Sequence, residues 1–281
     1  MPTKVVTFNS FAEYLSVAQQ EANCKTELLS SRREGERHFF GTVNFDDAVA
    51  LARTGWAEGA KQARSLRVAV DGVVNSLVCS RSRSYSFDLT GEYVDVGLHL
   101  CGDPECFGIE TDTPQLGDPV VRITVNRSVS SAISAESLIA RGTAIVAAID
   151  VLESLGRRVE LWIGDGSDFS DGRKKGRLEV YCKIKDASQP LDPDLVAFVL
   201  AHPSARRRLG FSVAEQHGFY PKKTSPSNLQ HAGDGIVTTC LRSGVDVSGR
   251  ELVANITSIC KQAGIEIPDE EIEELCKGVA A

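Results

Sequence analysis

The sequence lacks the features that mark membrane proteins, secreted proteins and nonspecific nucleic-acid coats. Its 281 residues contain no apolar run close to the ~20 residues that cross a bilayer. The first residues, Met1 to Phe8, have no apolar core of a signal peptide, so we expect a cytoplasmic protein that does not enter a membrane. With 31 Lys and Arg against 38 Asp and Glu, the net charge is −7, whereas a nucleic-acid coat needs excess positive charge.

Motifs of several common enzyme classes are also missing. The chain has no Gly-x-x-x-x-Gly-Lys-Ser/Thr loop and no Gly-x-Gly-x-x-Gly turn between a strand and a helix, which disfavours the common kinds of nucleotide binding. It has neither a Gly-x-Ser-x-Gly nucleophile elbow nor a His-Glu-x-x-His zinc motif. Function must therefore be argued from weaker signals.

The eight cysteines are scattered, and a chain of this length does not need disulfides to fold. We expect most of them to be free thiols in or near the core. The one local cluster consists of His99, Cys101 and Cys106. As a zinc site it offers only three ligands at an uncommon spacing, so buried thiols are the favoured interpretation.

The first part of the chain, residues 1–116, is expected to be a smaller α+β part. Ser10 opens a capping box, and Asn44 is suited to cap a second helix that ends near Gly55. Residues 93–100 alternate as in a strand. Two prolines and a glycine between 114 and 119 mark the best candidate boundary.

Residues 117–281 show a clearer α/β pattern. A β-branched strand at 120–125, a long helix from about Ser134 to Leu155 and a strand at 158–163 form a βαβ unit, whose strands should be parallel. A hydrophilic link, 164–176, leads to a strictly alternating segment, 178–185, which predicts an antiparallel edge strand. The expected fold is a Rossmann-like, mostly parallel sheet with that edge strand.

The remaining elements follow from caps and composition. Asp192 and Pro193 suit the start of a helix that buries Phe198 and Val199. Residues 236–241 read as another strand, and two helices near 249–263 and 268–277 are expected to close the chain.

Short polar side chains follow the first strand of the βαβ unit. Asn126, Ser128 and Ser130 stand in the order Asn-x-Ser-x-Ser, and Asp165 follows the next strand. Ligands of open α/β sheets bind outside the carboxyl ends of the strands. Three oxygen-bearing side chains on one turn could also converge on a hard cation. We therefore expect a polar rim that is open to a ligand.

This layout resembles a von Willebrand factor A domain over residues 120–241. In that family an Asp-x-Ser-x-Ser turn holds a magnesium-type ion, and the open position of the ion binds a carboxylate of a partner protein. The resemblance implies a site for Mg²⁺ or Mn²⁺ at Asn126, Ser128 and Ser130, and a partner surface that adds Asp165. The chain differs from the family because Asn126 replaces the Asp, which should weaken cation binding. Capping of the long helix by the same three residues is the structural alternative.

The whole chain more loosely resembles an uncharacterised family of phage-encoded proteins. The resemblance is carried by Phe40-Gly41-Thr42, by the stretch from Gly55 to Gly59, by Gly102 to Cys106 and by Arg141 to Ala144. It implies a viral origin, and the host cytoplasm as the location, without implying an activity.

The leading hypothesis is a non-enzymatic binding or assembly module that contacts a protein partner through the rim. An alternative is a nucleic-acid-associated protein whose basic patches meet on one face. Those patches consist of Arg173, Lys174, Lys175, Arg206, Arg207, Arg208, Lys222 and Lys223. A third hypothesis is an enzyme in the same crevice, with Asp165 or His202 as general base.

Overall fold

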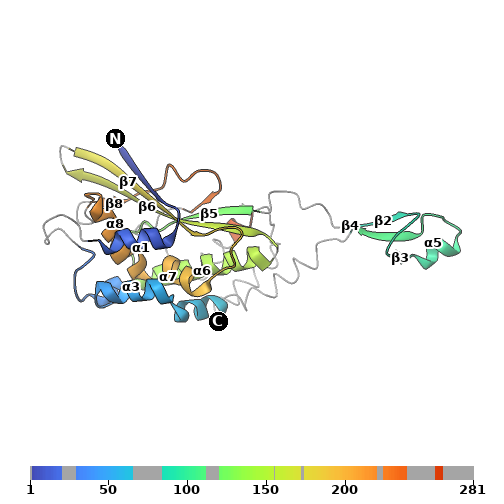
Figure 1. The fold of residues 1–281 in the computed structure, drawn as a ribbon, viewed down its shortest axis with the longest axis horizontal. Helices are drawn as coiled ribbons and strands as arrows, with labels where there is room; N and C mark the ends of the chain where they lie inside the picture. Colours follow the sequence, from blue (N-terminus) through green and yellow to red (C-terminus); the bar gives the residue numbers. More distant parts are fainter. Residues whose placement is uncertain are drawn as a thin grey trace.

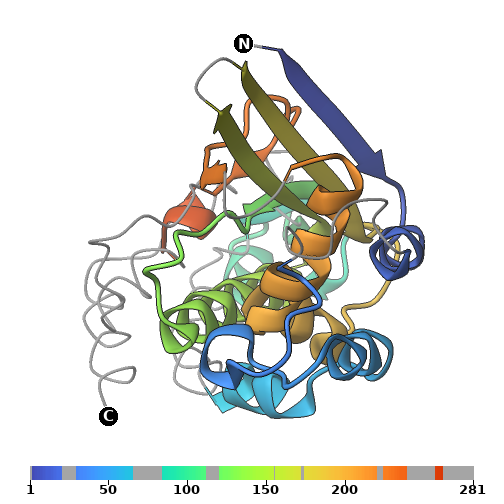
Figure 2. The ribbon, with the colours of Figure 1, turned by 90° about the vertical axis from the view of Figure 1, so that its left-hand side faces the viewer.

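The computed structural model describes two sheets and the helices around them. It covers residues 2–20, 30–65, 84–111, 120–154, 156–171, 174–219, 224–238 and 257–261. One sheet has six strands and the other has three. The views from two sides show the described helices of the larger unit gathered below the six-stranded sheet (Figures 1 and 2).

The six-stranded sheet has the order β1-β7-β6-β5-β9, with β8 also paired to β6. The strands are β1 (Thr3–Phe8), β5 (Val120–Asn126), β6 (Arg158–Asp171), β7 (Lys174–Lys185), β8 (Thr224–Pro226) and β9 (Ile236–Val237). Three pairings are parallel, namely β1 with β7, β5 with β6 and β5 with β9. Pairs β6–β7 and β6–β8 are antiparallel. The predicted α/β class with a mostly parallel sheet is confirmed.

The predicted βαβ unit is present. Strand β5 and strand β6 pair in parallel from Val120 opposite Arg158 to Asn126 opposite Gly164, and helix α6 (Ala135–Ser154) connects them. Ser134 begins this helix, because its side chain accepts a hydrogen bond from the Ser137 N–H at 3.1 Å.

Two expectations about the sheet need correction. Strand β7 is antiparallel to β6, as predicted, but it does not lie at the edge, because β1 pairs along its other side. The N-terminal part thus contributes a strand to the main sheet. The segment 164–176, expected to be a hydrophilic link, largely continues the sheet: β6 runs to Asp171 and β7 begins at Lys174.

Helices pack on one face of this sheet. Helices α1 (Phe11–Gln19), α3 (Phe45–Thr54) and α7 (Pro193–Ala201) begin at the predicted caps Ser10, Asn44 and Asp192, whose side chains accept backbone N–H groups. The others are α2 (Arg37–Phe40), the π-helical turn η2 (Ala205–Gly210), α8 (Phe211–Gln216) and the helical residues 57–65 and 257–261. Gly142 on α6 lets α7 approach closely, since an added Cβ would lie 2.3 Å from the Ala201 Cα.

The two faces of β6 contact different layers. Leu161 and Ile163 lie in the apolar clusters that the helices share with the sheet. Trp162, one residue away, points to the opposite face. There it packs with Tyr181 of β7 and with Ala232, which lies in the loop after β8. This alternation places helices on one face and the 227–235 loop on the other.

The three-stranded sheet has the order β2-β4-β3 and contains only antiparallel pairs. Its strands are β2 (Ser84–Asp88), β3 (Tyr93–Val94) and β4 (Phe107–Thr111), and helix α5 (Val96–Leu100) connects β3 to β4. The predicted strand over 93–100 is therefore wrong beyond Val94. Asp95 caps α5 instead, accepting the Leu98 N–H at 3.0 Å.

Several predictions lie outside the described residues. These are the boundary at 114–119, residues 239–241 of the last predicted strand and most of the two closing helices. Within the described part, no helix has the length and apolarity to span a membrane.

Candidate functional site

The turn after β5 is closed by hydrogen bonds to the backbone. The Asn126 Oδ1 accepts the Ser128 N–H at 2.9 Å, and the Asn126 Nδ2 donates to the Ser227 carbonyl at 3.2 Å. The Ser128 Oγ accepts the Gly166 N–H from β6 at 2.6 Å. Asn126 and Ser128 are both 0 % exposed. Their oxygens thus serve the turn and the sheet.

The prediction of an open rim at Asn126 and Ser128 is wrong. Strand β8 pairs with the part of β6 that extends beyond β5, and the following residue, Ser227, contacts Asn126. This segment covers the carboxyl end of β5. Ser130 is half-buried and Ser131 is exposed, so the accessible surface lies further along the turn.

The turn does not fit the predicted Mg²⁺ or Mn²⁺ ion. A cation would have to compete with the N–H groups of Ser128 and Gly166 for the same oxygens, and the Ser130 Oγ accepts the Ala132 N–H at 3.3 Å. The buried guanidinium of Arg127 lies in the same turn and would repel it. The capping alternative is also incorrect for Asn126 and Ser128, since Ser134 caps the helix.

A buried charge cluster lies beside this turn. The Asp165 carboxylate forms an ion pair with Arg127 at 2.5 Å through Oδ2 and another with Arg206 at 3.1 Å through Oδ1. Arg127 also donates to the Tyr14 hydroxyl at 3.0 Å and to the Val199 carbonyl at 3.3 Å. One carboxylate thus faces two buried cations, which leaves an excess positive charge.

The surroundings explain the protonation of this cluster. Burial raises the pKa of Tyr14 to about 12 despite the nearby Arg127, so its hydroxyl stays protonated. Burial by itself would lower the pKa of Arg127, but Asp165 and Tyr14 together hold it above its ordinary value. Asp165 is therefore engaged by cations, which does not suit the predicted role of general base.

Arg206 is incompletely paired. It is 8 % exposed, and its Nε and Nη1 atoms have no hydrogen-bond partner among the described residues, although Nε lies near the Asp165 carboxylate. Its guanidinium lies over the Phe211 ring, 5.1 Å from the centroid. Gly210 leaves the necessary space, because an added Cβ would lie 3.1 Å from the Arg206 Nη1. A buried donor without an acceptor is costly, and an anionic ligand would satisfy it.

Arg207 and Arg208 are structural rather than exposed. Arg208 donates to the Thr42 hydroxyl and to four backbone carbonyls of residues 31–43, at 2.7 to 3.1 Å. Arg207 donates to the carbonyls of Phe39 and Ile133, and burial lowers its pKa to about 10. The prediction of a solvated nucleic-acid patch at 206–208 is therefore wrong.

The other predicted basic contacts are only partly described. Lys175 is exposed at the start of β7. Arg173, Lys222, Lys223 and the Lys174 side chain lie outside the description.

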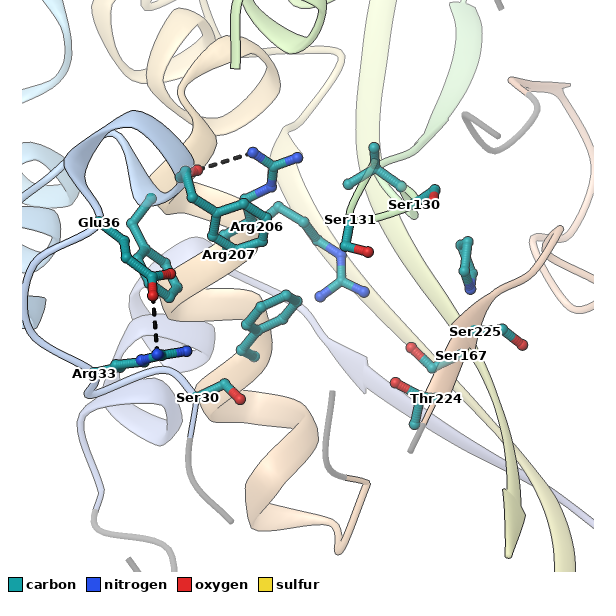
Figure 3. A pocket seen from close by; sticks show the side chains of 15 residues that line it. Ser30, Arg33, Glu36, Ser130, Ser131, Ser167, Arg206, Arg207, Thr224 and Ser225 are labelled. Atoms are coloured by element: carbon teal, nitrogen blue, oxygen red, sulfur yellow. Dashed lines mark hydrogen bonds and ion pairs between the residues drawn. The ribbon is translucent and has the colours of Figure 1, made fainter. Parts of the chain in front are cut away.

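A pocket of about 570 Å³ opens beside this cluster. Figure 3 shows its hydroxyl-bearing side chains spread over four segments: Ser30 lies near Arg33, Ser130 and Ser131 follow β5, Ser167 is on β6, and Thr224 and Ser225 are on β8. Arg206 and Arg207 project from the central helix layer, and Phe39, Phe40, Phe211, Val129 and Pro226 supply apolar contacts. Its volume falls in the range of small-molecule sites, roughly 300–1,000 Å³.

The far wall of the pocket contains an unusual backbone conformation. Gly35 and Glu36 both adopt positive φ values, +80° and +47°, immediately before α2. Glu36 forms a 3.0 Å ion pair with Arg33. A non-glycine residue in this region is uncommon and often occurs at functional sites. The exposed pair is neutral as a unit, so the net positive charge of the pocket comes from Arg206 and Arg207.

The remaining candidate residues lie elsewhere. His202 packs between the rings of Trp56 and Phe198, and burial lowers its pKa to about 4, so it is neutral at pH 7. The Cys106 thiol is buried 3.7 Å from the His99 Nδ1, whereas Cys101 is exposed. Among the described residues, no group of three His, Cys, Asp or Glu side chains could hold a metal ion.

Sequence reasoning located the right end of the sheet but missed the main residues of the pocket. Ser130 was predicted and does line it, whereas Arg206 was assigned to a surface patch. The sequence signal for this arrangement is Gly210, which follows the arginine run and permits close packing there.

Comparison with known proteins gives a family without a known activity. No curated protein and no solved structure shows a significant match. The resemblances to the von Willebrand factor A domain and to phage proteins therefore stay predictions. A family model described as a domain of unknown function, DUF7192, matches residues 2–266, and the chain belongs to that family.

Proposed function

We propose that the protein is a binding protein whose pocket takes a small molecule that carries a phosphate group. The observation that carries this proposal is Arg206, a nine-tenths buried guanidinium with two nitrogens that lack hydrogen-bond partners and that lines the pocket. Asp165 neutralises only one of its two arginine partners. An anion in the pocket would complete both the hydrogen bonds and the charge balance.

The surrounding groups favour phosphate over carboxylate. A phosphate group has several strong acceptor oxygens in a tetrahedral array, and six hydroxyl side chains from separate segments line the pocket around Arg206. A planar carboxylate would use fewer of them. The rings of Phe39, Phe40 and Phe211 fit an apolar remainder, so a phosphate monoester suits the pocket better than free inorganic phosphate.

A thermal unfolding titration tests this proposal. Phenyl phosphate, inorganic phosphate, sulfate and benzoate are added separately to the full chain at matched ionic strength. Phenyl phosphate should raise the unfolding midpoint most, because it carries both the phosphate group and the ring that fit the pocket. A ligand present at ~100 times its Kd adds about 2.7 kcal/mol to the free energy of unfolding. Benzoate, which carries the ring without the phosphate, should have little effect.

Two variants provide the controls. Arg206→Met should abolish the shift with phenyl phosphate, and Arg206→Lys should retain part of it because the positive charge remains. Arg158→Met changes an exposed arginine at the opposite end of β6 and should leave the shift unchanged. Equal shifts for Arg206→Met and the unmodified chain would refute the proposal, as would the absence of any shift at millimolar ligand.

A further inference from the structure

The three-stranded unit, residues 84–111, has almost no core of its own. Of its residues whose exposure is described, only Cys106 and Gly108 are buried. A three-stranded sheet needs a hydrophobic face packed against something to be stable. In Figure 1 the unit stands apart from the helices and the larger sheet.

Large apolar side chains are instead exposed on this unit. Six of the ten exposed large hydrophobic residues in the described part of the chain belong to it, namely Phe87, Leu89, Tyr93, Val94, Val96 and Leu100. Leu100 is 80 % exposed and Val96 is 66 % exposed. Both come from helix α5, so one short element presents two apolar side chains to solvent. Val96 and Leu100 are four residues apart and therefore lie on the same side of α5, and exposed apolar surface of this kind marks an interaction site.

The strand register groups two of the aromatic residues. Phe87 and Tyr93 lie opposite Gly108 from its two neighbouring strands, so both project from the same face of the sheet. The Tyr93 ring covers the glycine, since an added Cβ on Gly108 would meet the ring at 2.2 Å. Each aromatic side chain remains 40 % exposed.

The charge of the unit identifies the kind of partner. Between 84 and 111 the sequence has six carboxylates (Asp88, Glu92, Asp95, Asp103, Glu105 and Glu110) and no Lys or Arg. The unit therefore accounts for −6 of the net charge of −7, and the rest of the chain sums to −1. Two copies brought together here would repel each other, whereas a basic surface would be attracted.

We infer that the 84–111 unit is a docking surface for a basic protein segment that contributes apolar side chains to it. The partner covers the exposed apolar residues and completes the core that the unit lacks, while its Lys or Arg side chains face the carboxylates. Among the described strands β2 pairs with β4 alone, and an extended partner segment would pair along its other edge. This surface is separate from the phosphate pocket and does not depend on it.

A labelled peptide of alternating lysine and leucine is a suitable probe. Its binding to the full chain is followed by fluorescence anisotropy, beside a lysine–serine peptide and a glutamate–leucine peptide. Only the lysine–leucine peptide combines positive charge with apolar groups, so it should bind most tightly, and its affinity should fall as salt is raised. Equal binding of the glutamate–leucine peptide, or no binding at low salt, would overturn the inference.

Matched variants locate the peptide on the molecule. Val96→Ser with Leu100→Ser should weaken the peptide about tenfold or more, because two apolar side chains leave the interface. Val5→Ser with Val237→Ser removes two exposed valines of the larger sheet and should have no effect. Circular dichroism checks that both variants fold.

Two further outcomes count against the inference. Glu92→Lys with Glu105→Lys, both exposed, should weaken the peptide and flatten its salt dependence; unchanged affinity would contradict the electrostatic argument. A concentration-dependent dimer in analytical ultracentrifugation that Leu100→Ser disrupts would make a second copy of the chain the occupant, and would replace our proposal.

Discussion

Replacing Arg206 with methionine tests whether its guanidinium serves to bind a ligand or to stabilise the fold. Methionine retains an unbranched side chain that can pack against Phe211 and removes only the guanidinium. Asp165 keeps its 2.5 Å ion pair with Arg127, so the substitution leaves no buried carboxylate without a partner. The change therefore isolates the contribution of the guanidinium itself.

The magnitude follows from two opposing contributions. The variant loses the 3.1 Å ion pair with Asp165 and the contact with the Phe211 ring, together about 1–3 kcal/mol. It also removes the buried Nη1, which has no hydrogen-bond partner among the described residues and costs about 1–3 kcal/mol when unsatisfied. The two contributions are similar in size, so we expect the free energy of unfolding to stay within about 1 kcal/mol of that of the unmodified chain. A binding residue that is replaced at no cost to stability is typical of functional sites.

Urea denaturation in phosphate-free buffer measures this difference. Arg127→Met serves as the contrast, because Arg127 also binds Tyr14 and Val199; its loss should cost about 3–5 kcal/mol. If Arg206→Met destabilises the chain as much as Arg127→Met does, Arg206 is a structural cation and the reasoning fails.

Three more expectations concern stability. Arg208→Ala should cost about 3–5 kcal/mol in urea denaturation, because five acceptors in residues 31–43 lose their donor; a loss below 1 kcal/mol would contradict this account. Gly142→Val should lower the free energy of unfolding by at least about 1–3 kcal/mol, since even a Cβ would collide with Ala201. Gly218→Ala is the control: its Cβ meets no neighbour, and the positive φ of this residue should cost only about 1 kcal/mol. His202, with its pKa lowered to about 4, takes up a proton more readily when unfolded, so stability should fall by about 3 kcal/mol as pH drops from about 6.5 to about 4. His202→Gln should flatten that slope, and an unchanged slope would show that other groups cause it.

Local patterns predicted much of the larger sheet and its helices. The cap residues Ser10, Asn44 and Asp192 each begin the helix expected of them, because a side-chain oxygen next to a free N–H is a short-range interaction. The buried strand β5 and the alternating strand β7 were also recognisable. Strand β1 was not, because its exposed residues give it little hydrophobic periodicity and its pairing with β7 joins distant parts of the chain.

The site depended on contacts that no local pattern contains. A turn rich in Asn and Ser is usually exposed, and a run of three arginines is usually solvated. Here β8 crosses the carboxyl end of β5 and buries Asn126 and Ser128, while the π-helical turn η2 carries Arg206 to Arg208 into the protein. In both cases the partners lie far away in the sequence.

The sequence by itself determined the α/β class, the βαβ unit and the concentration of negative charge between residues 84 and 111, because periodicity, capping and charge are properties of neighbouring residues. Only the tertiary structure decided which polar groups are buried and which face a pocket. Burial of a charged side chain such as Arg206 depends on acceptors and space that Asp165, Gly210 and Phe211 provide together. That arrangement exists only after strand β6 and the helix layer have packed.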